Sequence, residues 1–155
     1  MEVSIRELCT SLKQQEGMYL DMRRLSHQQL EAARDPAGSG FDEGLILKQK
    51  AKLVEDLQLA AARARLIESD LANQFGLPEF TIKSLHGKID NELYQSLVQA
   101  YEGLSRILKD ITELDDYTIG LIGSRLAAYQ RPRQRPTNAL QALQAYRDGT
   151  RIKKD

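Results

Sequence analysis

Residues 46–71 read ILKQKAKLVEDLQLAAARARLIESDL, and the spacing of their apolar side chains sets the architecture of the chain. These side chains recur at alternating steps of three and four, which keeps them on one side of an α-helix. The resulting seam is Ile46, Leu53, Leu57, Ala60, Ala64, Ile67 and Leu71, interrupted by Lys50 alone. Phe75-Gly-Leu-Pro78 then ends the helix, because glycine accepts the left-handed cap conformation and proline follows it.

A long helix is also predicted before this segment, from about Glu2 to Arg34. Its seam keeps the same spacing and consists of Ile5, Leu8, Leu12, Tyr19 and Met22, with Gln15 filling the one place between them. The stretch Asp35-Pro-Ala-Gly-Ser-Gly ends the helix, since a proline and two glycines favour a turn. The second helix is therefore expected to begin near Ser39 or Asp42.

A third helix is predicted from about Lys88 to Tyr129. Its seam consists of Leu93, Leu97, Ala100, Leu104, Ile107, Ile111, Leu114 and Leu121, with Thr118 in the intervening place. At a rise of about 1.5 Å per residue it spans roughly 60 Å, against about 50 Å for its neighbours. Residues 77–87 connect it to the second helix, and Phe80, Ile82 and Leu85 suit a short helical turn over one end.

The fold class that follows is all-α: an elongated antiparallel bundle of three long helices with a short mobile C-terminal helix. The 155 residues favour one domain, divided into a helical body over 1–130 and a different segment over 131–155. That segment holds seven basic and two acidic residues, a net charge of +5, so the neutral chain leaves −5 on the body. A basic segment beside an acidic body suits binding to acidic partners, to nucleic acid or to the body itself.

The 131–155 segment opens with a hinge at Pro132 and Pro136, which cannot continue a helix. Asn138 and Gln141 then have the spacing of a helix start, and Leu140, Leu143 and Tyr146 recur on one narrow face. A helix this short is marginal alone in water, so it is expected to gain structure by docking. Both its own body and a partner protein suit that role. The arginines at 131, 133 and 135 fit a solvated linker better than a phosphate clamp, because no aromatic residue accompanies them.

The residues that usually carry chemistry do not converge in this sequence. It has no glycine-rich phosphate loop and no cysteine pair, and its two histidines, His27 and His86, lie on separate elements. The acidic residues Glu113, Asp115 and Asp116 suit a solvated helix face, and Cys9 a partly buried, inert thiol. We therefore expect neither an enzyme nor a protein that needs a cofactor or metal. The charged N-terminal residues and the lack of about 18 consecutive apolar residues predict a cytoplasmic protein without membrane insertion.

Three stretches resemble the FlgN family of flagellar export chaperones. They are Leu47-Lys-Gln-Lys-Ala-Lys-Leu-Val-Glu-Asp-Leu57, Leu114-Asp-Asp-Tyr-Thr-Ile-Gly-Leu-Ile122 and Tyr146-Arg-Asp-Gly-Thr150. The order of elements is similar as well, and the resemblance covers most of the chain. Asp115 and Thr118 stand where the family has asparagines, and the third stretch is one residue shorter than the family pattern.

The resemblance implies a chaperone that binds the C-terminal helices of the two hook-associated junction proteins, keeps them unassembled before type III export, and delivers them to the export gate protein FlhA. It assigns substrate binding to Leu140, Leu143 and Tyr146, and contact with the gate to Tyr146. The residues alone leave another class open, a structural or adaptor helical protein that forms homo-oligomers through its seams. Nucleic-acid binding ranks last, because the acidic body repels phosphate.

Overall fold

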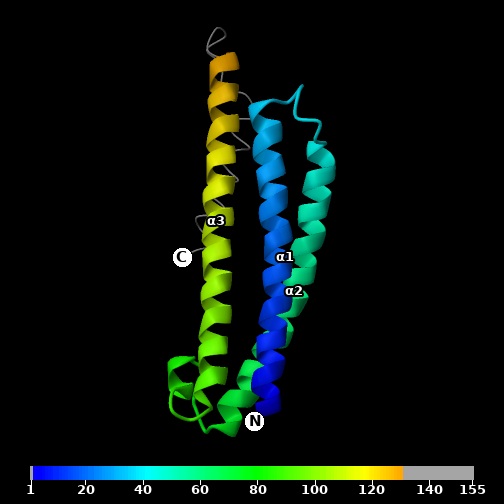
Figure 1. Cartoon of the computed structure of the whole chain (residues 1–155). Helices are drawn as coiled ribbons and strands as arrows, with labels where there is room; N and C mark the ends of the chain where they lie inside the picture. Colours follow the sequence, from blue (N-terminus) through cyan, green and yellow to red (C-terminus); the bar gives the residue numbers. More distant parts are fainter. Residues whose placement is uncertain (1, 131–155) are drawn as a thin grey trace.

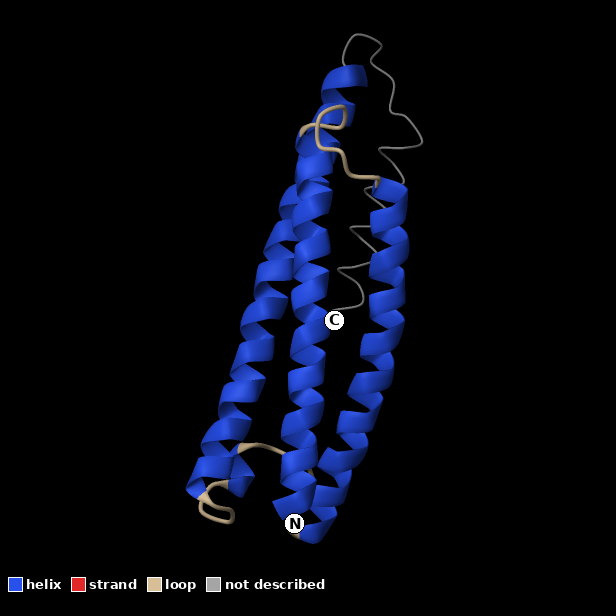
Figure 2. Ribbon diagram, turned by 45° about the vertical axis from the view of Figure 1, so that its right-hand side comes forward, coloured by secondary structure: helices blue, strands red, loops and turns tan. Residues whose placement is uncertain are grey.

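The computed structural model describes residues 2–130, which form three long helices and one short turn of 3-10 helix (Figure 1). The helices are α1 (Glu2–Arg34), α2 (Glu43–Gln74) and α3 (Asn91–Gln130), and the 3-10 turn is η1 (Lys83–Leu85). Within these residues there is no strand (Figure 2), so the all-helical prediction is confirmed. The predicted C-terminal helix and its hinge at Pro132 and Pro136 lie outside the described residues.

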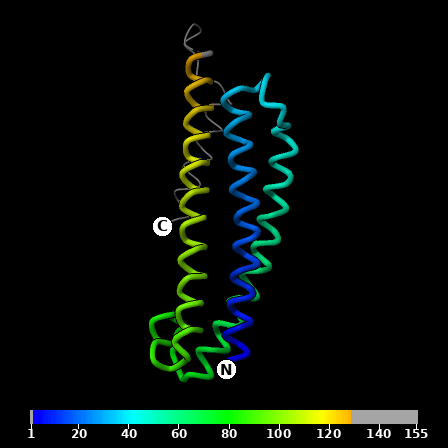
Figure 3. Tube along the Cα trace, viewed as in Figure 1, coloured from blue at the N-terminus to red at the C-terminus, as the bar shows by residue number. Residues whose placement is uncertain are grey.

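Helix α1 lies between α2 and α3, and it packs along both of them (Figures 1 and 3). The first residues of α1 meet the end of α2 and the beginning of α3, because Leu8, Leu71 and Leu97 belong to one buried cluster. The last turns of α1 lie beside the beginning of α2 and the second half of α3, where Lys50 contacts both Gln29 and Asp115. The contacts at both ends thus show which parts of the three helices lie side by side.

The predicted seams are the buried faces of the helices. In α2 the buried seam residues are Ile46, Leu57, Ala60, Ala64 and Leu71, and in α3 they are Leu97, Leu104, Ile107, Ile111 and Thr118. Helix α1 buries a wider surface than its seam predicts, because it contacts a helix on each side. Beyond Met22 the buried residues Ser26, Leu30 and Ala33 continue the seam, and the buried residues Leu25 and Ala32 lie beside it and widen the buried face.

Local chemistry fixes where the helices begin and end. Asp42 caps α2 by accepting a hydrogen bond from the backbone N–H of Leu45 at 3.2 Å, which confirms one of its two predicted starts. Gly76 follows the end of α2 with φ +65°, and Leu77 N–H donates to the carbonyl of Ala72 at 2.8 Å. The predicted turn over one end is η1, and it fully buries Leu85.

Helix α3 begins three residues later than predicted, at Asn91 in place of Lys88. The reason is the turn before it, where Gly87 has φ +77° and Lys88 N–H donates to the carbonyl of Leu85 at 3.0 Å. Lys88 therefore belongs to the turn that closes η1. The first helical turn is set by Asp90, whose carbonyl accepts from Tyr94 N–H at 2.9 Å.

Candidate functional site

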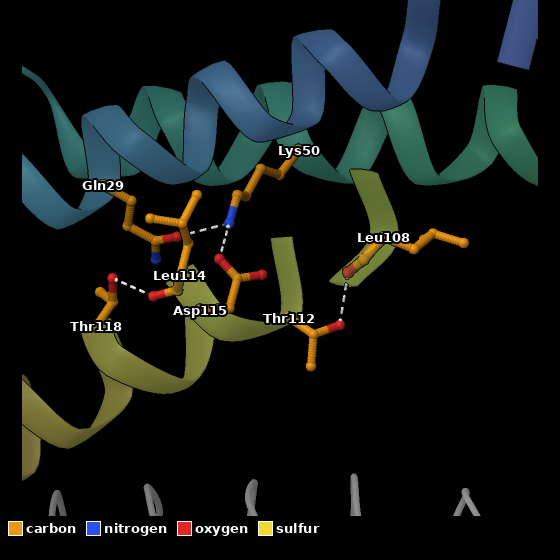
Figure 4. Close-up of polar contacts among 7 residues, drawn as sticks. All are labelled: Gln29, Lys50, Leu108, Thr112, Leu114, Asp115 and Thr118. Carbon is orange, nitrogen blue, oxygen red and sulfur yellow. Dashed lines mark hydrogen bonds and ion pairs between the residues drawn. The ribbon is translucent and has the colours of Figure 1, made fainter. Parts of the chain in front are cut away.

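Helices α2 and α3 reach each other through a polar layer of three side chains. Lys50 Nζ of α2 donates to Asp115 Oδ1 of α3 at 3.0 Å and to Gln29 Oε1 of α1 at 2.7 Å (Figure 4). The Lys50 side chain is only 14% exposed, so its charge requires these partners. The one interruption of the α2 seam is therefore the point at which all three helices are joined.

The position of Asp115 corrects the interpretation of the acidic stretch in α3. The sequence predicted a solvated face made of Glu113, Asp115 and Asp116. Glu113 and Asp116 are exposed, but Asp115 is partly buried and pairs with Lys50. Its partner lies 65 residues away, so no spacing within α3 could have revealed the pair.

Thr118, one turn further along α3, is buried in the seam and satisfies its own hydroxyl. Its Oγ1 donates to the carbonyl of Leu114 at 2.9 Å, within the same helix (Figure 4). It is 2% exposed and needs no partner from another helix. The Lys50–Asp115 pair brings this stretch of α3 face to face with the stretch of α2 around Lys50.

A second contact between α2 and α3 lies nearer to the end of α2 and the beginning of α3. Tyr101 Oη donates to Glu68 Oε1 at 2.6 Å. Burial raises the pKa of the Tyr101 phenol, and both the hydrogen bond to Glu68 and the charge of that carboxylate raise it further. Together with the polar layer, this contact fixes the register of α3 against α2.

Exposed apolar side chains lie along α2 and α3 beside these polar contacts. On α2, Leu47 comes one turn before Lys50 and Val54 one turn after it, and they are 55% and 44% exposed. On α3, Leu108 lies seven residues from both Tyr101 and Asp115, so it shares the face that these residues turn toward α2, yet it is 42% exposed. We call Leu47, Val54 and Leu108 the α2/α3 strip.

Two further exposed leucines of α2 lie on a different face. Leu59 and Leu66 are 62% and 68% exposed and are separated by seven residues, on the side of α2 that points away from its seam. Neither adjoins a residue of α2 that contacts α3. Leu59 is therefore a matched control for Val54, since both are exposed apolar residues of the same helix.

The residues that could carry chemistry stand apart from one another. His86 packs edge-on against Tyr94, with ring centroids 5.1 Å apart. His27 lines a shallow pocket beside the Arg23–Asp110 ion pair, whose atoms are 3.2 Å apart. Burial raises the pKa of the partly buried Cys9 thiol, which makes it less reactive. Within residues 2–130 no three histidine, cysteine or carboxylate side chains gather as a metal site, and no helix could cross a membrane.

The substrate-binding residues predicted from the resemblance, Leu140, Leu143 and Tyr146, lie outside the described residues. No protein-family model, no curated protein and no solved structure matches this chain. The α2/α3 strip was not predicted from the sequence. The signal was present in the heptad spacing of Leu47 and Val54, which places a second apolar stripe beside the seam of α2.

Proposed function

We propose that this protein is a cytoplasmic chaperone of flagellar type III export, similar in role to the FlgN family. In this proposal the three helices form an elongated antiparallel bundle, and residues 138–146 form a short C-terminal helix beyond the hinge at Pro132 and Pro136. The chaperone holds the C-terminal helices of hook-associated junction proteins, prevents their premature assembly and brings them to the export gate protein FlhA.

The observation that supports this proposal most is the α2/α3 strip. Three large apolar side chains along two neighbouring helices offer the kind of surface that an amphipathic helix covers. Leu47 and Val54 of the strip adjoin the polar layer, in the half of the molecule where α3 leads into residues 131–155. A bound helix could therefore contact the body and Leu140, Leu143 and Tyr146 at the same time.

The physical chemistry of the 131–155 segment suits a chaperone that must release its substrate. A helix of nine residues is marginal by itself, so ordering it on binding costs free energy and weakens the complex. Weaker binding makes transfer to the gate easier. In the proposal Tyr146 contacts both the substrate and FlhA, so binding at the gate competes directly with binding of the substrate.

A calorimetric titration with a peptide of a junction-protein C-terminal helix tests this function. We expect binding to the full chain and loss of binding on deletion of residues 131–155, while circular dichroism reports an unchanged helical body. Leu143→Asp should weaken binding at least about tenfold, because it places a charge in the apolar face. Ala145→Asp, on the opposite face of the predicted helix, is the matched control. Equal binding by the full and the shortened chain would rule out the proposed role of the segment.

Self-assembly is the second candidate, and Leu59 and Leu66 favour it. Two exposed leucines one heptad apart on the outward face of α2 are the arrangement by which helices pair. Sedimentation at micromolar concentration distinguishes the two candidates. A dimer that Leu66→Glu dissociates, together with no binding of the junction peptide, would favour the structural protein over the chaperone.

A further inference from the structure

We propose that residues 138–146 of this chain pack on the α2/α3 strip as a fourth helix when no partner is bound. This inference goes beyond the proposed function, because it concerns the free protein and holds whether or not a substrate exists. It commits to one occupant of the strip, the chain's own segment.

The strip needs a cover that the described helices do not provide. Helix α1 packs along both α2 and α3, but it fills the side where their seams face it. On the side of the strip, α2 and α3 touch through long side chains, Lys50 to Asp115 and Glu68 to Tyr101. Leu47, Val54 and Leu108 therefore stay exposed beside contacts that already hold the two helices at a fixed separation.

The two polar contacts also define the register of the strip. Lys50, early in α2, faces Asp115, late in α3, whereas Glu68, later in α2, faces Tyr101, earlier in α3. The residue numbers therefore run in opposite directions along the two helices. Leu47, three residues before Lys50, is therefore level with Thr118, three residues after Asp115. By the same reasoning Val54 is level with Ile111, and Leu108 lies about one turn further from the end of α3.

The length of chain beyond α3 fits this register. The end of α3 at Gln130 lies twelve residues beyond Thr118, a distance of about 18 Å along the helix. Residues 131–137 can extend over about 23 Å, so Asn138 can return to the level of Leu47. A helix over 138–146 is about 13 Å long, and Leu47 and Val54 are about 10 Å apart along α2. Its apolar face, from Leu140 to Tyr146, spans about 9 Å and thus matches the Leu47–Val54 part of the strip in length.

Charge favours the basic segment 131–155 as the cover of the strip, and tethering favours the chain's own segment over that of a second copy. Residues 131–155 carry +5 and the remainder of the chain −5, so attraction brings the segment toward its own body. A short connection also holds it at an effective concentration of the order of millimolar. A second copy at micromolar concentration would have to displace this local competitor.

Disulfide trapping tests the proposal in the full chain. On a Cys9→Ser background, Val54→Cys is combined with Leu143→Cys, and oxidised glutathione accepts the two electrons as the disulfide forms. The control combines Leu59→Cys with Leu143→Cys. We expect the Val54 pair to close within one chain at least about tenfold faster, because a disulfide requires Cα atoms within about 7 Å. Peptide mass mapping identifies the bond, and a non-reducing gel separates monomers from dimers.

Each outcome of this experiment decides the proposal. Closure of the Val54 pair within the monomer supports it. Equal rates for the two pairs, or mainly disulfide-linked dimers, would overturn it, and dimers would indicate a second copy on the strip.

Hydrogen exchange provides a measurement without cysteines. Val54→Asp should lower the protection of amides 138–146 at least about tenfold, and Leu59→Asp should not, while circular dichroism is unchanged for both. Equal protection in the two variants contradicts the proposal. These readouts involve no substrate, so they can fail while the junction peptide still binds, and the peptide can fail to bind while the segment still docks.

Discussion

The two ends of the molecule differ in the polar contacts that join their helices. At the end where α2 leads into η1, Leu8, Leu71, Leu85 and Leu97 are completely buried in one apolar cluster. At the other end Lys50 binds Gln29 and Asp115, and Arg125 donates to the backbone carbonyl of Arg34. The first end is held by this apolar cluster, and the second adds the polar contacts to buried apolar side chains such as Leu30, Ala33 and Ile46.

In our proposal this difference separates stability from function within one set of helices. Apolar packing is non-directional and strong, so it suits an end that has only to stay folded. Polar contacts have fixed geometry, and here they keep α2 and α3 in register while leaving apolar side chains exposed beside them. The polar end is the one that adjoins residues 131–155. In our proposal the surface for another helix therefore lies where polar contacts supplement the apolar packing of the body.

The largest expected effect is on the stability of the packed end. Leu8→Ala should lower the free energy of unfolding by about 3–4 kcal/mol, because it leaves a cavity in a fully buried cluster. Leu108→Ala, the same change on the α2/α3 strip, should cost less than about 1 kcal/mol. Urea unfolding followed by circular dichroism measures both values. If the two variants lose the same stability, the contrast between the packed end and the α2/α3 strip is wrong.

A smaller effect is expected at the polar layer. Asp115→Ala should lower the free energy of unfolding by about 1–3 kcal/mol, because Lys50 then keeps only Gln29 as its partner. Combining it with Lys50→Met removes the charge as well, and this double variant should recover most of the loss. A double-mutant cycle built from urea unfolding gives the coupling between the two residues. Additive effects would mean that the pair does not join α2 to α3.

These contrasts also explain how much of the structure the sequence predicted. The caps at Asp42 and Gly76 and the seams of all three helices follow from chemistry within a few residues, and the structure confirms them. Lys50 was recognised as an interruption, but its partners Gln29 and Asp115 lie on other helices, 21 and 65 residues away. Periodicity describes one helix at a time and does not say which side a neighbour covers. For that reason it missed the additional buried face of α1 and the exposed strip on α2 and α3.

The predicted site residues show the same limit in another form. Leu140, Leu143 and Tyr146 were identified from spacing and from the resemblance to the FlgN family, and they lie outside the described residues. Their roles therefore remain predictions. The strip on the body is a property of α2 and α3 together, because its members come from two helices.

The smallest expected effect concerns Tyr101, whose hydrogen bond to Glu68 lies between the two ends. Burial, the hydrogen bond and the carboxylate charge raise the pKa of this phenol in the folded state above its ordinary value near 10. Above pH 10 the unfolded chain therefore loses this proton while the folded chain keeps it, so stability falls as the pH rises. Below pH 10 both states keep the proton, and the contribution is constant.

Urea unfolding at pH 8 to 11 measures this effect, with Tyr101→Phe as the matched variant. The variant should be somewhat less stable at pH 8, because Glu68 loses its donor, and it should lose less stability than the wild-type protein between pH 10 and 11. Absorbance near 295 nm should show one tyrosine fewer ionising in the folded wild-type protein than after unfolding. Parallel pH profiles would contradict this account, and would mean that the register of α2 against α3 depends on the polar layer at Lys50 and not on this contact.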